Sequence, residues 1–126
     1  MNNQVIKRGE KDGLITPYGG ELKQLIIEEE IKKQKLISET NFEIECSERN
    51  ACDVELLMIG AFSPLEGFMD ESDYISVIHH NRIQKGFLFG LPIVFDTDNK
   101  NIVIGEKILL TYKGQNLAVL EVSTIW

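Results

Sequence analysis

The sequence predicts an α+β fold, in which helices come first and a small, partly closed antiparallel β-barrel or sheet follows. Three observations predict this class. Apolar residues recur at helical spacing in several segments before residue 80. From residue 91 onward, short runs rich in Val, Ile and Leu are separated by turn residues. A chain of 126 residues fits one domain and leaves room for a core of its own.

The beginning of the chain divides into an arm and a first helix. Residues 1–13 are charged and poor in apolar side chains, so we expect a flexible arm before a domain over residues 14–126. Residues 14–20 read as a short extended entry broken by Pro and Gly-Gly. Leu22, Leu25 and Ile26 have the i, i+3, i+4 spacing of one helical face, and this helix is expected to continue or restart through residues 31–36.

The middle of the chain predicts a strand followed by a helix. Residues 42–46 alternate apolar and polar, as in a half-buried strand. Ser47 is a good N-cap for a helix over residues 48–59, and Gly60 would end it. The inward face of this helix is expected to hold Ala51, Val54, Leu57 and Met58. Arg49 and Asp53 lie four residues apart, so we expect an intrahelical ion pair rather than a catalytic cation.

An apolar, turn-rich loop over residues 61–69 precedes the next helix. Asp70 or Ser72 can cap that helix, whose inward face would hold Tyr74, Val77 and Ile78. Strands are predicted over residues 91–95, 101–104, 108–112 and 117–122. Residues 98–100 and 113–116 are the expected hairpin loops.

Composition and charge argue against several classes of partner and site. The net charge is -7, which argues against nucleic acid as a partner because phosphate binders usually present a basic face. No apolar run approaches the length of a membrane helix, and the polar start lacks a signal peptide, so no membrane partner and a cytoplasmic location are expected. Cys46 and Cys52 are expected to be reduced, buried thiols, and His79-His80 lacks the partners of a metal site.

Three stretches of the sequence resemble one enzyme family, the ATP sulfurylases (sulfate adenylyltransferases). The first stretch is Leu14-Ile15-x-Pro17-x-Gly19-Gly20. The second is Arg49-x-x-x-Asp53-x-Glu55-x-x-x-x-Gly60-Ala61-Phe62-Ser63-Pro64-Leu65-x-Gly67-Phe68-Met69. The third continues with Asp73-Tyr74, Arg82, Gly86, Pro92-Ile93 and Asp96. The chain departs from the pattern at Tyr18, where the family usually has His, and at residues 83 and 89–91.

The resemblance implies a PUA-like fold and a domain that takes no part in catalysis. The complete enzyme would be a nucleotidyltransferase that makes adenosine 5'-phosphosulfate and pyrophosphate from Mg-ATP and sulfate. The family's catalytic signatures, Gln-x-Arg-Asn and His-x-x-His, do not occur in this sequence. We therefore expect no catalytic, cofactor-binding or metal residue in this chain and no activity of the chain alone. Its expected partner is the catalytic domain of the same enzyme, with a homo-oligomer as a further option.

The motif positions have a structural or interdomain role under this resemblance. They are Pro17, Gly19, Gly20, Arg49, Asp53, Gly60, Phe62, Ser63, Pro64, Gly67, Phe68 and Met69. The apolar loop could line a site or dock a second domain, or it could plug one end of the barrel. Gly60 and Gly67 are expected where the backbone needs conformations that other residues resist. A stand-alone PUA-like module that binds RNA or a regulatory ligand remains the alternative function.

Overall fold

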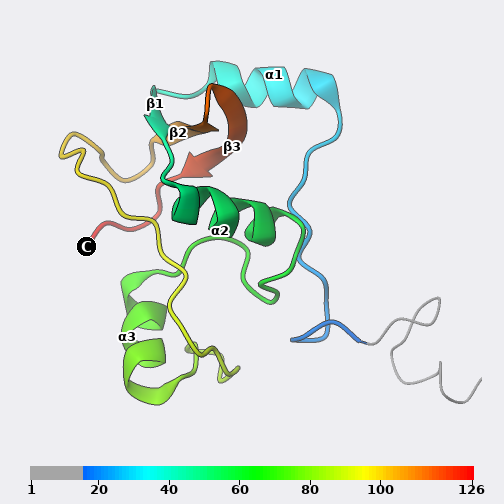
Figure 1. Ribbon diagram of the computed structural model, residues 1–126, viewed down its shortest axis with the longest axis vertical. Helices are drawn as coiled ribbons and strands as arrows, with labels where there is room; N and C mark the ends of the chain where they lie inside the picture. Colours follow the sequence, from blue (N-terminus) through cyan, green and yellow to red (C-terminus); the bar gives the residue numbers. More distant parts are fainter. Residues whose placement is uncertain (1–15) are drawn as a thin grey trace, which may run out of the picture.

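The computed structural model describes residues 16–126. In this part of the chain the elements are α1 (Glu30–Ser38), β1 (Phe42–Glu45), α2 (Glu48–Met58), α3 (Glu71–His80), β2 (Lys107–Tyr112) and β3 (Gln115–Glu121) (Figure 1). The α+β class is confirmed. The expectations for residues 1–13 and for Leu14 and Ile15 lie outside the described residues.

The three strands form one mixed sheet in the order β1-β2-β3. β2 and β3 form the predicted hairpin, but its turn is only Lys113-Gly114, both residues having the positive φ that a tight two-residue turn requires (49° and 76°). β1 pairs in parallel with β2, with Phe42 opposite Ile108. The expectation of an antiparallel sheet is therefore wrong for this pair. The long connection between β1 and β2 allows the parallel arrangement, which a tight turn cannot make.

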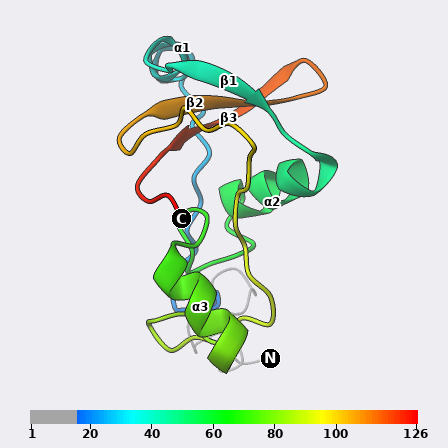
Figure 2. The same ribbon diagram turned by 90° about the vertical axis from the view of Figure 1, so that its left-hand side faces the viewer.

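Helices lie on both sides of this sheet. Figure 2 shows α1 beyond β1 at one end of the molecule, α2 on the other side of the sheet, and α3 at the far end of the long axis. α1 has no buried residue, whereas α2 buries Ala51, Val54 and Leu57 as predicted. The Ser47 side chain accepts a hydrogen bond from the Asn50 N–H at 3.1 Å, which confirms the predicted N-cap of α2.

α3 begins at the first of its two candidate caps. The Asp70 carboxylate accepts from the Asp73 N–H at 2.8 Å, so Asp70 and not Ser72 is the cap. Val77 is buried as predicted. Ile78 is 50% exposed, so its assignment to the inward face is wrong. The reason is that α3 packs on loops rather than on the sheet, and only a narrow stripe of it is covered.

The predicted helix around Leu22, Leu25 and Ile26 is absent. These residues lie in an irregular segment, residues 21–29, which we call the strap, and α1 begins only at Glu30. The Leu25 N–H donates to the Met58 carbonyl at 2.8 Å, and the Lys23 N–H donates to Ser63 Oγ at 2.9 Å. The strap thus satisfies backbone groups against the end of α2 and the loop after it, in place of helical hydrogen bonds.

Two of the four predicted strands near the C-terminal end are also absent. Residues 91–95 and 101–104 are irregular. The Ile93 carbonyl accepts from the Met69 N–H at 2.7 Å, and the Val103 N–H donates to the Glu106 carboxylate at 3.0 Å. These groups bond to loops and side chains, so no ladder forms although the apolar pattern is strand-like.

Two clusters of buried residues make up the core of the described residues. The sheet-side cluster holds Cys46, Ala51, Val54, Ile108, Leu110 and Val122. The loop-side cluster holds Leu57, Leu65, Met69, Val77, Ile83 and Ile93. Phe68 packs against both clusters and lies 5.5 Å from Phe95, measured between ring centroids. Cys46 is a buried free thiol as expected, but Cys52 is exposed, because it points away from the face of α2 that carries Ala51 and Val54.

Candidate functional site

The fold brings two motif segments of the sequence into contact. The first is residues 17–20, which we call the entry turn, and the second is residues 60–69, the motif loop. The Gly20 N–H donates to the Pro17 carbonyl at 2.9 Å and closes the turn. Gly19 has φ +82°, and a Cβ there would lie 2.8 Å from Cβ of Pro64. Only glycine fits both the backbone conformation and the close approach of the two segments.

The motif loop also contacts the strap, and we call its contacts with the entry turn and the strap the junction. Gly60 has the same function as Gly19 at the strap end of this junction. Its φ is +83°, and an added Cβ would lie 2.8 Å from Leu22 Cδ1 and 3.3 Å from the Lys23 carbonyl oxygen. Gly60 therefore ends α2 and lets the strap pass closely over the helix end. Gly67 differs, because its φ is not positive and nothing lies within 4 Å of its Cβ position. The expectation for Gly67 is wrong.

Ser63 connects the strap to the motif loop. Its side chain is buried, donates to the Gly60 carbonyl at 2.6 Å and accepts from the Lys23 N–H at 2.9 Å. The Ser63-Pro64 peptide bond is cis. The donor and one acceptor lone pair of this hydroxyl are used in bonds to the backbone, as in a structural hydroxyl.

Tyr18 holds the entry turn against a second loop. Its hydroxyl donates to the Leu88 carbonyl at 3.1 Å, and its ring makes edge contacts with Phe87 and Phe89, with centroids 5.6 and 6.2 Å away. Sequence reasoning treated Tyr18 only as a departure from the family pattern. The two aromatic side chains Phe87 and Phe89, two residues apart, were the sequence feature that could have indicated an aromatic partner for Tyr18.

The apolar residues of the motif loop point into the protein. Leu65 and Met69 are buried, and Phe62 and Phe68 are half-buried against the loop-side cluster. These side chains form part of the core, and Leu65, Phe68 and Met69 also border the groove described below.

Arg49 and Asp53, in contrast, do not join the junction. Among the ion pairs of residues 16–126, none connects these two side chains, so the predicted intrahelical pair is absent. Arg49 is exposed on α2 and contributes to the wall of the groove described below.

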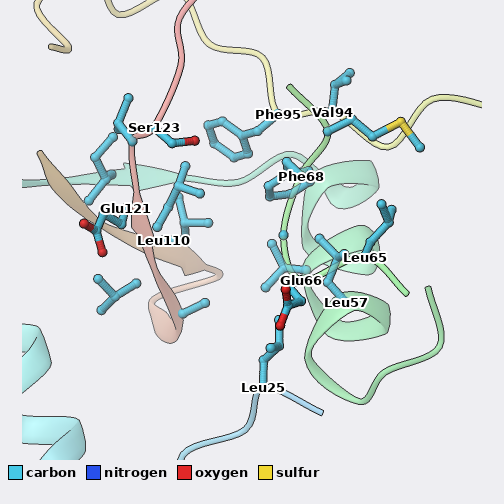
Figure 3. A pocket seen from close by; sticks show the side chains of 18 of the residues that line it. Leu25, Leu57, Leu65, Glu66, Phe68, Val94, Phe95, Leu110, Glu121 and Ser123 are labelled. Carbon is cyan, nitrogen blue, oxygen red and sulfur yellow. The ribbon is translucent and has the colours of Figure 1, made fainter. Parts of the chain in front are cut away.

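A groove of about 1660 Å³ runs beside the contact between α2 and the sheet and along the motif loop. Figure 3 shows apolar side chains from both sides facing it, among them Leu110 from β2 and Leu57 and Phe68 from the opposite wall. The carboxylates of Glu66 and Glu121 also border it. Small-molecule pockets usually hold about 300–1,000 Å³. The volume of the groove lies above this range, and its lining includes core side chains such as Leu57 and Leu110, which are almost fully buried.

The titratable groups with perturbed pKa values serve the fold. A hydrogen bond from Lys107 at 2.9 Å lowers the pKa of Glu39 and raises that of Lys107, joining the residue after α1 to β2. Burial raises the pKa of the Cys46 thiol, and the nearby Glu45 carboxylate adds to the effect. A raised pKa keeps this thiol protonated, which is the opposite of an activated nucleophile.

The described residues present neither a cluster of metal ligands nor a membrane-spanning helix. Within residues 16–126, no three His, Cys, Asp or Glu side chains are grouped so that they could hold a metal ion. His79 and His80 lie in the last turn of α3, with ring centroids 6.3 Å apart. No helix of the described residues is both long and apolar enough to cross a bilayer.

Comparison with known proteins identifies a family and a set of relatives. The model of the PUA-like domain family matches residues 15–126. The sulfate adenylyltransferase of Phaeosphaeria nodorum is 40% identical over 119 residues, which cover 87% of this chain and 21% of that protein. The sulfate adenylyltransferase of Yarrowia lipolytica is 45% identical over 89 residues, which cover 69% of this chain and 16% of that protein. The chain therefore spans about one-fifth of the length of these relatives.

A solved structure has the same fold. The hexameric APS kinase from Thiobacillus denitrificans matches with a TM-score of 0.76 and 31% identity. The match covers 90% of this chain and 24% of that chain.

Proposed function

Because the chain belongs to the PUA-like domain family, we propose that it is the N-terminal, non-catalytic domain of a sulfate adenylyltransferase and that it folds and docks against the catalytic part. One observation carries the proposal. The chain is similar over 87% of its length to a sulfate adenylyltransferase of which it covers only 21%. Such a ratio is typical of one domain of a larger enzyme.

The geometry of the motif residues supports a structural role. Gly19 contacts Pro64, Gly60 lies under Leu22, and Ser63 bonds to the Gly60 carbonyl and the Lys23 N–H. These residues are therefore engaged with one another rather than with a shared open space. A binding site would instead direct several polar groups toward one ligand position.

The proposed chemistry of the whole enzyme requires residues that this chain does not contain. Sulfate is a weak nucleophile toward the α-phosphorus of ATP, so catalysis must come from positioning and from cations that neutralise the phosphates. Mg²⁺ bound with ATP would supply part of that charge. The Gln-x-Arg-Asn and His-x-x-His signatures associated with this chemistry are absent from the sequence. We therefore assign ATP and sulfate binding to the rest of the enzyme.

An activity assay with two components tests this proposal. The purified chain alone is expected to show no pyrophosphate release that depends on both ATP and sulfate. The Phaeosphaeria nodorum enzyme without the segment that matches this chain is expected to bind the added chain and to gain stability from it. Turnover by the chain alone would contradict its non-catalytic assignment. Absence of any association with the shortened enzyme would contradict the docking role.

A further inference from the structure

We propose that the entry turn, residues 17–20, is a lid that detaches locally while the rest of the domain stays folded. Tyr18 is the latch that keeps the lid closed, and the hydrogen bond between Lys23 and Ser63 is the anchor at which the detachment stops. The lid is a property of this chain and does not depend on the proposed function. Three features support it: the exposed contacts of the turn, the buried anchor after it, and the apolar surface beneath it.

The entry turn is held by contacts that remain open to solvent. Residues 18–22 are exposed, and Tyr18 is 50% exposed although its ring touches two aromatic side chains. Its hydroxyl donates to the Leu88 carbonyl at 3.1 Å, and this hydrogen bond is exposed as well. Such a bond adds little net stability, because water offers both groups an equivalent partner. Segments with few buried apolar contacts and exposed hydrogen bonds open at low free energy.

The chain is fixed firmly just after the turn, where the strap passes the end of α2 on its way to α1 (Figure 1). The Lys23 N–H donates to Ser63 Oγ, whose side chain is buried and bonds in turn to the Gly60 carbonyl. The Leu25 N–H donates to the Met58 carbonyl at 2.8 Å. Breaking the bond to Ser63 would leave a buried hydroxyl short of a partner, which is costly. Detachment is therefore expected to end before Lys23.

The surface beneath the lid is apolar and has its own support. Pro64 lies so close to Gly19 that a Cβ on the glycine would be 2.8 Å from the proline Cβ. Phe87 and Phe89 contact the Tyr18 ring, and with the lid in place these two rings and Pro64 are half-buried. Both rings also pack against the loop-side cluster. They stay in place when the lid leaves, so one short turn controls the exposure of an ordered apolar surface.

Amide exchange at two positions of the full chain tests the lid. The Gly20 N–H bonds to the Pro17 carbonyl within the turn, and the Lys23 N–H bonds to the anchor. Measured by NMR at several low urea concentrations, exchange at Gly20 is expected to be at least about tenfold faster than at Lys23 after correction for the intrinsic rates. Exchange at Gly20 is also expected to be insensitive to urea, because local opening exposes little surface.

Substitution of the latch tests the role of Tyr18. Tyr18→Ala is expected to speed exchange at Gly20 about tenfold or more and to change exchange at Lys23 by no more than about twofold. Tyr18→Phe keeps the ring and removes only the hydroxyl, so it is expected to cause a smaller acceleration at Gly20. Ile31→Ala is the matched control, because Ile31 is 77% exposed on α1, outside the lid and its anchor. It is expected to leave both rates unchanged.

Three results would overturn the lid. Exchange at Gly20 that rises with urea as steeply as global unfolding would show that the turn opens only with the whole domain. Unchanged exchange at Gly20 in both Tyr18 variants would remove the latch. Equal acceleration at Gly20 and Lys23 in Tyr18→Ala would show that the turn and the strap detach together, without an anchor between them.

Discussion

Gly60 is the residue at which three requirements meet: the end of α2, a positive φ and the close passage of the strap. Gly60→Ala is expected to lower the free energy of unfolding by about 1–3 kcal/mol, because a side chain at this φ is strained and would displace Leu22. Urea denaturation measures the change. The matched control is Gly67→Ala, which is expected to change the stability by no more than about 0.5 kcal/mol because its Cβ position is open. Equal effects of the two substitutions would show that Gly60 has no special role.

Ser63 offers a second test of the junction, this time through hydrogen bonds. Ser63→Ala removes the acceptor of the Lys23 N–H and a donor to the Gly60 carbonyl, and it is expected to cost about 1–3 kcal/mol. Thermal or urea unfolding measures this loss. Ser38→Ala is the control, since its exposed hydroxyl donates only to the Lys35 carbonyl. If both variants lose the same stability, the buried position of Ser63 does not matter and the junction argument fails.

The two cysteines differ in environment although they lie close in sequence. Cys46 is buried with a raised pKa, whereas Cys52 is exposed on α2. At about pH 8 a thiol reagent is expected to modify Cys52 quickly and Cys46 only after unfolding, because the thiolate is the reactive form. Mass spectrometry of the Cys52→Ser variant isolates the reaction of Cys46. Fast labelling of this variant in its folded state would contradict the burial of Cys46.

The same pKa shift has a defined effect on stability. The folded state holds the Cys46 proton at pH values where the unfolded chain releases it, so its contribution to stability is complete below the ordinary thiol pKa of 9.0. That contribution declines as the pH rises above this value. This decrease in stability at high pH comes from the thiol, so we expect it to be absent from a Cys46→Ala variant. The cavity in that variant lowers its stability already at neutral pH, so the two proteins are compared by the change in their free energy of unfolding between neutral and high pH.

At the scale of the element, α3 depends on its cap because it buries little else. Asp70→Ala is expected to cost about 1 kcal/mol, since the carboxylate accepts from the Asp73 N–H and lies at the positive end of the helix dipole. Ser72→Ala is the control within the same turn and is expected to change the stability by no more than about 0.5 kcal/mol. Urea unfolding followed by circular dichroism compares the two. A larger loss of stability in Ser72→Ala than in Asp70→Ala would show that Ser72, and not Asp70, caps α3.

Elements with local signals were predictable from the sequence. α2 and α3 carry their own caps, β1 carries an alternating pattern, and the β2–β3 hairpin carries two apolar runs around a turn, so the presence of these elements followed from neighbouring residues. The strap did not, because the spacing of Leu22, Leu25 and Ile26 is equally compatible with an extended segment bonded to the end of α2. The parallel pairing of β1 with β2 joins residues such as Phe42 and Ile108, far apart in the chain, and no local pattern specifies such a pair.

The junction between motifs was predictable only in its parts. The sequence identified Gly19, Gly60 and Ser63 as motif positions, but their spacing carries no information that Gly19 meets Pro64 or that Ser63 bonds to Lys23 across 40 residues. These contacts arise from the path of the strap, which the helical periodicity misassigned. The role of Tyr18 was missed for the same reason, since its partners Phe87 and Phe89 belong to a distant loop.

At the scale of the whole molecule, the two core clusters are connected through few groups. The sheet-side cluster and the loop-side cluster share α2, which contributes Val54 to one and Leu57 to the other. Phe68 is the side chain that packs against both. The groove lies beside this connection, so the sheet and α3 depend on a narrow contact for cooperative unfolding. Such a contact can be tested by removing one side chain.

Phe68→Ala is expected to separate the unfolding of the two halves of the molecule. The single Trp, Trp126, lies 4.5 Å from Tyr74 of α3 between ring centroids, so its fluorescence reports the α3 side. Amide exchange within β2 and β3, followed over the same urea concentrations, reports the sheet. In the wild type the two urea transitions are expected to coincide, as for a two-state domain. In Phe68→Ala the fluorescence transition is expected to come first, with a total loss of stability on the order of 2–3 kcal/mol.

Phe62→Ala is the control, because Phe62 packs only against the loop-side cluster. Its removal lowers the stability without removing the link between the two clusters. Coincident transitions in Phe68→Ala would show that α2 alone couples the sheet to α3.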